Sequence, residues 1–423
     1  MSAGDPVLGT LARRVGWLVM AEGASRVTRI VTALALAYAL EPVLFGVAAL
    51  AMTVCELMRT PTRCGVLQAV VRADENDLGA TMQTAITINW VWHICLALAQ
   101  IAIAYPLEAW MDAPGLAEPL IVLSVLFFLY PVAFGRIAFL HRAGNMKKIA
   151  GIVGATLSLA NLATAALALA GFGLWSVVLP RILSALLWIG LAYRAVPVLP
   201  EFGGERASTR DVLRYGQSIL GSEMLKAAQG SLDKIIIGKL LGMEALGFYT
   251  FAFNAGLGLS QSLLKGFSDA LFPYLCQSRR ANGDYRQPKQ ILAMTAMTAL
   301  VLFGTQAVLA PVYVPMLFGD RWEPAVLTLA LLCLSAITRP FWDVPAQTLR
   351  AEGTPKIEFV ASIAQTTLLL LATGFGAMTY GIVGAAAGCL ATRLATEPLF
   401  AFFVFRTREP RGQALDTLPL TTH

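Results

Sequence analysis

Long apolar segments separated by short polar junctions run through almost the whole chain. Most segments contain roughly twenty or more residues, the length an α-helix needs to cross a ~30 Å hydrocarbon core. Pro, Gly and charged residues mark nearly every junction. Because lipid offers the backbone no hydrogen-bond partners, each segment is expected to be helical. The pattern predicts an all-α polytopic membrane protein with about twelve spans: 13–40, 43–68, 80–106, 116–139, 149–171, 173–195, 213–240, 245–275, 290–312, 323–348, 357–378 and 381–405.

The composition supports this prediction and excludes a soluble domain. Hydrophobic residues make up 57% of the chain and charged residues only 14%, whereas a soluble protein carries about a quarter charged residues. The mean hydropathy is +0.66. The net charge of +6 does not indicate nucleic-acid binding, because the basic residues cluster in the short loops between spans.

These loops alternate in charge along the chain. Loops rich in Lys and Arg are expected on the cytoplasmic side of a membrane. The basic set contains Arg13, Arg14, Arg72, Arg142, Lys147, Lys148, Arg206, Arg210, Arg214, Arg279, Arg280, Arg286, Lys289, Lys356, Arg406, Arg408 and Arg411. The opposite set contains Glu41, Glu108, Asp112, Glu118, Glu244, Asp320 and Glu323, with Lys239 and Arg321 as its cations. We therefore expect both termini in the cytoplasm, and no cleavable signal peptide is visible before the first span.

Several short motifs recur with a period of about 200 residues. Arg14-Val15-Gly16 returns as Arg214-Tyr215-Gly216, Phe45-Gly46 as Leu246-Gly247, and Phe172-Gly173-Leu174 as Tyr380-Gly381-Ile382. Six spans per repeat give both halves the same orientation, so a pseudo-two-fold axis along the membrane normal is expected to relate them. The predicted organisation is an N-terminal six-helix bundle (1–197), a cytoplasmic linker (198–212), a C-terminal six-helix bundle (213–405) and a cytoplasmic tail (406–423).

Ionisable residues occur inside four of the predicted spans, the first two of each half. An ionised group at the centre of a span costs about 2.5–3.5 kcal/mol, so it normally faces a wet cavity or a partner. The residues concerned are Glu22, Arg26, Arg29, Glu56, Arg59, Arg63, Glu223, Lys226, Asp233, Lys234, Lys265 and Asp269. One interpretation is a cationic cavity between the halves, where guanidinium groups bind a phosphate-bearing head group. The other is local ion pairing, as in Glu56 with Arg59 or Lys265 with Asp269.

The motifs of common enzyme classes are absent from the sequence. It contains no GxxxxGK[ST] loop, no HExxH and no CxxC pair, and its six cysteines are scattered through apolar segments. We therefore expect neither an enzyme nor a bound cofactor or metal. Six tryptophans are expected in interfacial belts: Trp90, Trp92, Trp110, Trp175, Trp322 and Trp342.

Several stretches resemble the polysaccharide transporter and Wzx-like oligosaccharide flippase family of the multidrug/oligosaccharidyl-lipid/polysaccharide exporter superfamily. They are LDKIIIGKLLGMEALGFYTFAFN (Leu232 to Asn254), ALFPYL (Ala270 to Leu275), LFGDRW (Leu317 to Trp322) and RAEGTPK (Arg350 to Lys356). The resemblance extends from Leu11 to about Arg406 and implies the fold of the multidrug and toxic-compound extruders, two six-helix bundles in a V. The sequence ends after the twelfth predicted span, so we do not expect the additional helices that some relatives carry.

The resemblance implies that an undecaprenyl-diphosphate-linked oligosaccharide is flipped from the cytoplasmic to the periplasmic leaflet of the bacterial inner membrane, by alternating access, for exopolysaccharide or O-antigen synthesis. A cationic cavity is a theme of the family, and the positions expected to line it are Arg26, Arg29, Arg59, Lys226 and Lys265. Glu56, Asp233 and Asp269 are candidates for coupling to a proton or sodium ion. A polysaccharide polymerase and export machinery are the expected protein partners.

Two alternative functions stay open at this stage. A cation-coupled drug antiporter shares the fold, but its binding site needs an excess of acids. A membrane-embedded polysaccharide polymerase needs a catalytic loop outside the membrane, and the loops of this chain are short.

Overall fold

The computed structural model describes residues 28–63, 65–198, 208–258, 287–352 and 354–406. Every element in these ranges is a helix, and none is a strand. After a first helix at Thr28–Ala39, the elements are α2 (Pro42–Arg59), η1 (Thr60–Arg63), α3 (Val66–Arg72), α4 (Leu78–Met111), α5 (Ala117–Arg142), α6 (Met146–Leu169), α7 (Trp175–Ala195), α8 (Thr209–Ala252), η2 (Phe253–Leu257), α10 (Gln287–Phe318), η3 (Asp320–Ala325), α11 (Val326–Ile337), α12 (Pro340–Ala351) and α13 (Pro355–Arg406).

Nine helical segments in the described ranges are long and apolar enough to cross a membrane. Two of the longest helices change direction at a glycine. The helix α8 breaks at Gly242, which has φ 86°, and α13 breaks at Tyr380 and Gly381, where Gly381 has φ 61°. A positive φ is readily adopted only by glycine, and these breaks coincide with the expected junctions between spans 7 and 8 and between spans 11 and 12. The all-helical membrane fold is thus confirmed, while the count of twelve stays a prediction.

Two expected spans are not continuous α-helices. Span 43–68 ends as an α-helix at Arg59 and continues through the 3₁₀ turn η1 to Gly65, which has φ 72°. Span 323–348 is interrupted between α11 and α12, immediately before Pro340. The physical reason is proline: Pro61 and Pro340 lack the N–H that would continue the helical ladder and restrict the residue before them.

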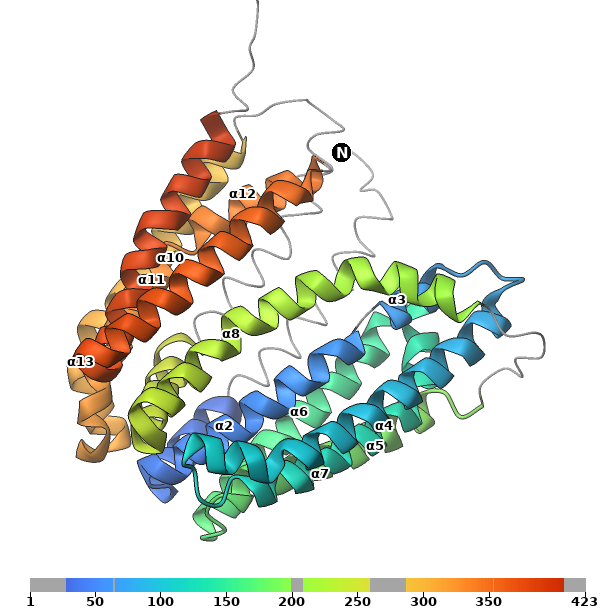
Figure 1. Cartoon of the computed structure of the whole chain (residues 1–423), viewed down its shortest axis with the longest axis horizontal. Coiled ribbons are helices and arrows are strands. Elements are labelled where there is room, and N and C mark those ends of the chain that lie inside the picture. Colours follow the sequence, from blue (N-terminus) through green and yellow to red (C-terminus); the bar gives the residue numbers. More distant parts are fainter. Residues whose placement is uncertain (1–27, 64, 199–207, 259–286, 353, 407–423) are drawn as a thin grey trace, which may run out of the picture.

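The helices form two groups that meet at one end and diverge at the other (Figure 1). The helices α2 to α7 make up the first group, and α10 to α13 the second. Between them lies α8, which packs against α2 on one side and α13 on the other. The predicted boundaries between bundles, linker and tail stay a prediction, and residues 199–207 and 407–423 lie outside the described residues.

The groups meet where α2 crosses the part of α8 that follows Gly242. At this crossing, a Cβ atom on Gly46 would lie 1.9 Å from the Met243 carbonyl oxygen. A Cβ atom on Gly247 would lie 1.9 Å from the Pro42 carbonyl oxygen. Each glycine therefore packs against the carbonyl four residues before the other glycine, so the contact is reciprocal. The two glycines are those of the repeated Phe45-Gly46 and Leu246-Gly247 motifs.

An aromatic cluster beside this crossing is centred on Trp322, which is fully buried. The rings of Phe45, Phe248 and Phe251 lie 5.4, 5.9 and 4.1 Å from it. Its indole N–H donates to the Ala37 carbonyl at 2.9 Å. The prediction that Trp322 lies in an interfacial belt is therefore wrong. The same prediction is wrong for Trp342, which is 6% exposed and stacks on Phe400. Large rings in helix contacts bury more apolar surface there than in a belt.

Candidate functional site

Glu56 and Arg59 on α2 lie beside Tyr130 on α5 and within electrostatic reach of Arg181 on α7. Glu56 and Arg59 form an ion pair of 2.7 Å between Oε2 and Nη2, and their side chains are 46% and 30% exposed. The Arg59 guanidinium lies 5.2 Å from the ring centre of Tyr130 on α5. Arg181 on α7 interacts electrostatically with both Arg59 and Glu56. We call these four residues the α2 cluster; it carries two formal positive charges against one negative.

The α2 cluster contains both a local ion pair and an excess of positive charge, the two features that the alternative interpretations of the sequence predict. Glu56 and Arg59 make the pair that local ion pairing predicts, three residues apart on one helical face. Arg181 adds a second cation, which comes from another helix and is therefore not predicted by spacing along α2. Its helix is the last of the first group, so only packing brings it to α2.

Arg29 links the first helix to the turn that follows η2. Its Nη1 donates to the Gly258 carbonyl at 3.2 Å, across 229 residues of chain. The same turn of the helix is held by Asn161 on α6: Asn161 Nδ2 donates to Thr28 Oγ1 at 3.0 Å, and Thr32 Oγ1 donates to the Asn161 carbonyl at 2.7 Å. These bonds hold this turn of the first helix between α6 and the residue that follows η2.

Asp233 on α8 is 7% exposed and accepts two hydrogen bonds. Tyr249 Oη donates to Oδ2 at 3.0 Å, and the Lys234 backbone N–H donates to Oδ1 at 2.8 Å. Because Tyr249 follows the break at Gly242, the first bond ties together the two parts of α8. Arg393 on α13 also interacts electrostatically with Asp233.

The structure brings only some of the predicted site residues together. Glu56 and Arg59 share the α2 cluster, whereas Arg29 and Asp233 have their own partners. Lys226 belongs to α8, but its side chain lies outside the described residues, as do all of Arg26, Lys265 and Asp269. No group of three His, Cys, Asp or Glu residues in the described ranges is arranged to hold a metal ion.

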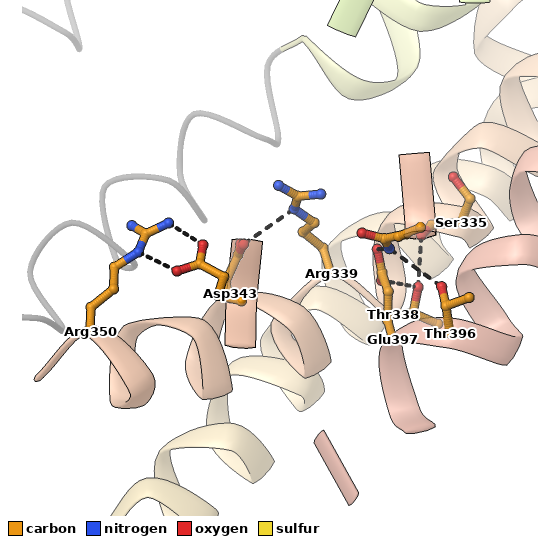
Figure 2. A network of polar contacts seen from close by, with 9 residues as sticks. Ser335, Thr338, Arg339, Asp343, Arg350, Thr396 and Glu397 are labelled. Carbon is orange, nitrogen blue, oxygen red and sulfur yellow. Dashed lines mark hydrogen bonds and ion pairs between the residues drawn. The ribbon is translucent and has the colours of Figure 1, made fainter. Parts of the chain in front are cut away.

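A network of polar contacts runs along α12 and α13 (Figure 2). Arg339 Nε pairs with Asp343 Oδ1 at 3.3 Å. Arg350 pairs with Glu358 through two hydrogen bonds, the one from Nε to Oε2 measuring 2.7 Å. Glu397, fully buried on α13, accepts from Thr338 Oγ1 at 2.6 Å and from Gln365 Nε2 at 3.2 Å.

The first two of these pairs line a pocket of about 330 Å³ between α8, α12 and α13, which we call the α12 pocket. Its walls are Leu225, Gln229, Arg339, Trp342, Asp343, Ala346, Gln347, Arg350, Glu358, Phe359 and Ser362. A sequence signal for it existed: Arg339, Asp343 and Gln347 are spaced by four and Arg350 follows three later, so one face of α12 is polar.

Fold and charged clusters together define a multi-pass helical membrane protein of the transporter class. Among solved structures, the chain superposes on the inward-facing conformation of a multidrug resistance MATE family transporter with a TM-score of 0.75, at 13% identity over 90% of this chain and 94% of that one. It superposes on the lipid II flippase MurJ in an inward closed conformation with a TM-score of 0.73, at 10% identity over 92% and 87% of the two chains.

Residues 35–327 match the family model described as polysaccharide biosynthesis protein, and the chain belongs to this family. A relative, the succinoglycan biosynthesis transport protein ExoT of Rhizobium meliloti (strain 1021), is 26% identical over 404 residues, which cover 94% of this chain and 80% of that protein. The family membership and the superfamily fold expected from the sequence motifs are thereby confirmed.

Proposed function

We propose that the protein flips a polyprenyl-diphosphate-linked oligosaccharide across the bacterial inner membrane, from the cytoplasmic to the periplasmic leaflet, for exopolysaccharide or O-antigen synthesis. Membership of the polysaccharide biosynthesis family supports this proposal. So do the similarity to the succinoglycan biosynthesis transport protein ExoT and the fold shared with the lipid II flippase MurJ. The carrier is the undecaprenyl lipid that the family resemblance implies.

The observation that carries the proposal is the excess of cations in the α2 cluster. Arg59 and Arg181 outnumber Glu56 within apolar helices, so the cluster attracts an anion rather than a cationic drug. A guanidinium also stays charged when partly desolvated and offers paired donors to phosphate oxygens. In this proposal Arg59 and Arg181 bind the diphosphate, with Arg26, Arg29, Lys226 and Lys265 as further positions along its path.

Alternating access then requires the two groups of helices to separate where they now meet. With the basic loops in the cytoplasm, the divergent end in Figure 1 is the cytoplasmic side, and the Gly46–Gly247 crossing closes the periplasmic side. The head group enters from the cytoplasm while the polyprenyl tail stays in lipid. Transport then needs the α2–α8 crossing to open and the cytoplasmic ends to close.

In this proposal, a proton or sodium ion couples to transport at an acidic side chain. Glu56 is the better candidate of the described acids, because its side chain is 46% exposed, whereas Asp233 is buried and hydrogen-bonded to Tyr249. A proton or sodium ion that neutralises Glu56 would release Arg59 from its ion pair. A polymerase and export machinery would take up the flipped sugar.

Reconstitution in proteoliposomes tests the function directly. The substrate is undecaprenyl diphosphate bearing the complete repeat unit, extracted from the cells that make it. Transport is measured as the appearance of sugar accessible to a membrane-impermeant lectin. Protein-dependent flipping supports the proposal; no flipping of this substrate, together with efflux of a cationic dye from the same vesicles, would replace it with the drug antiporter.

A further inference from the structure

The α12 pocket differs from the α2 cluster in its charge balance. Two arginines and two acids line it, and they form two pairs, Arg339 with Asp343 and Arg350 with Glu358. The described residues of the wall therefore carry no net formal charge. Because a carboxylate stands beside each guanidinium, a diphosphate would meet repulsion here as well as attraction. The pocket suits a ligand that is polar without carrying much charge.

The wall contains both donors and acceptors of hydrogen bonds. Arginine only donates them and a carboxylate only accepts them, whereas the amide of Gln347 carries both functions. Gln229 also lies in the wall, and its Nε2 donates to Thr366 Oγ1 at 2.7 Å. A sugar hydroxyl is itself both a donor and an acceptor, so adjacent hydroxyls can be matched by adjacent groups on this wall. Figure 2 shows the terminal nitrogens of Arg339 directed away from Asp343, which leaves its ion pair on Nε alone.

The apolar part of the wall is aromatic. Trp342 is held rigidly by Phe400, whose ring centre lies 4.3 Å away at an interplanar angle of 23°. Phe359, in contrast, is 40% exposed and borders the pocket. An aromatic ring of this kind covers the apolar C–H face of a sugar while the neighbouring polar groups bind its hydroxyls. The volume of about 330 Å³ falls at the lower end of the range for small-ligand sites, which suits a short segment of an oligosaccharide.

We infer that the α12 pocket binds the sugar portion of the transported lipid, while the α2 cluster binds its diphosphate. This inference rests on the proposed function and divides recognition between the two groups of helices. The α2 cluster then accepts any lipid with this diphosphate, and the α12 pocket selects the glycan attached to it. Selection then depends on how well the hydroxyls of the glycan match the donors and acceptors of the wall.

Flipping of two lipids by matched variants tests the inference. One lipid is undecaprenyl diphosphate with the complete repeat unit, and the other carries only the first sugar of that unit. We expect Phe359→Ala, and separately the charge-conserving double variant Arg339→Gln/Asp343→Asn, to slow flipping of the complete unit about five- to tenfold. Both should leave flipping of the single-sugar lipid nearly unchanged.

Phe375→Ala is the matched control, because Phe375 lies on the same helix, is 68% exposed and does not line the pocket. It should flip both lipids at the wild-type rate. Unchanged flipping of the complete unit by both pocket variants would overturn the inference, and so would an equal loss for both lipids. If the wild-type protein flips neither lipid, the proposed function itself is wrong.

Discussion

Arg59 differs from an ordinary surface ion-pair partner in its surroundings. Glu56 pairs with it, Tyr130 lies beside its guanidinium, and Arg181 adds a second positive charge within electrostatic reach. An exposed Arg–Glu pair contributes less than about 1 kcal/mol to stability. A loss of function at Arg59 that exceeds any loss of stability would therefore identify a binding role.

Replacing Arg59 with Ala should reduce polymer export and flipping at least about tenfold without lowering the amount of protein in the membrane. Arg59→Lys should be intermediate, because it keeps the charge but loses the planar fork that pairs with phosphate. Arg321→Ala, at an exposed position in η3, should have no effect. The measurements are flipping rates and immunoblots of membranes; a fall in abundance that parallels the fall in export would favour a purely structural ion pair.

Glu397 is expected to matter for stability through its buried hydrogen bonds. Glu397→Ala removes the shorter of two hydrogen bonds from each of two donors, since Thr338 Oγ1 keeps the Ser335 carbonyl at 3.0 Å and Gln365 Nε2 keeps Thr396 Oγ1 at 3.4 Å. It also empties the space of a fully buried side chain. The lost hydrogen bonds, at about 0.5–1.5 kcal/mol each, and the lost packing should lower the melting temperature in detergent. Glu323→Ala, at an exposed position, provides the comparison. Equal melting temperatures for the two variants would contradict this role.

Among the helices, the crossing of α2 and α8 depends on two residues without side chains. Close approach of this kind is typical of membrane helices, whose contacts use small residues because lipid provides no hydrophobic drive for association. The two parts of α13, before and after the break at Gly381, also pack through glycines. A Cβ atom on Gly376 would lie 2.1 Å from the Gly384 carbonyl oxygen, and one on Gly384 would lie 2.0 Å from the Gly376 carbonyl oxygen. Glycine therefore sets the distance between helices in both places.

Gly46→Ala and Gly247→Ala should each destabilise the protein by about 1–3 kcal/mol, because the added methyl group forces two backbones apart. The double variant should cost less than the sum, since the first substitution already separates the helices at the same crossing. Gly151→Ala and Gly190→Ala should be neutral or slightly stabilising, because a Cβ there meets nothing within 4 Å. Thermal denaturation of the five variants measures these effects; strictly additive losses would contradict a shared crossing.

The breaks in the helices could be read from the sequence, but their contacts could not. Proline and glycine act through the local backbone, so the turns at Gly242 and Gly381 follow from residues at the site itself. The repeat of Phe45-Gly46 as Leu246-Gly247 was likewise visible. That these glycines touch each other's helix depends on how the halves pack, which no short stretch of sequence specifies.

The candidate site was only partly predictable for a similar reason. Glu56 and Arg59 lie three residues apart on one helix, so their pairing is a local property. Arg181 joins them from α7, and the polar face of α12 opens onto a pocket that α8 and α13 complete. Charge inside a span indicates that a helix faces water or a partner, but the direction it faces is decided by its neighbours.

For the whole protein, the divergence of the two groups toward one side predicts which side admits water-soluble reagents. In a variant with all six native cysteines replaced, Gln347→Cys should react with a membrane-impermeant maleimide in inverted vesicles, where the cytoplasmic face is outside. Glu323→Cys should react in right-side-out vesicles instead. The reverse pattern would contradict the orientation inferred from the basic loops, and labelling of Gln347→Cys from both sides would contradict a closed periplasmic end.

The reciprocal glycine contact has a consequence for how such a chain can be built. A contact in which each partner presents the same motif to the other is isologous, the type found in two-fold symmetric dimers. An unfused half with one copy of this motif would present the same surface for pairing with an identical half. Duplication and fusion of such a half would keep the crossing in place and leave the remaining helices of each copy able to diverge.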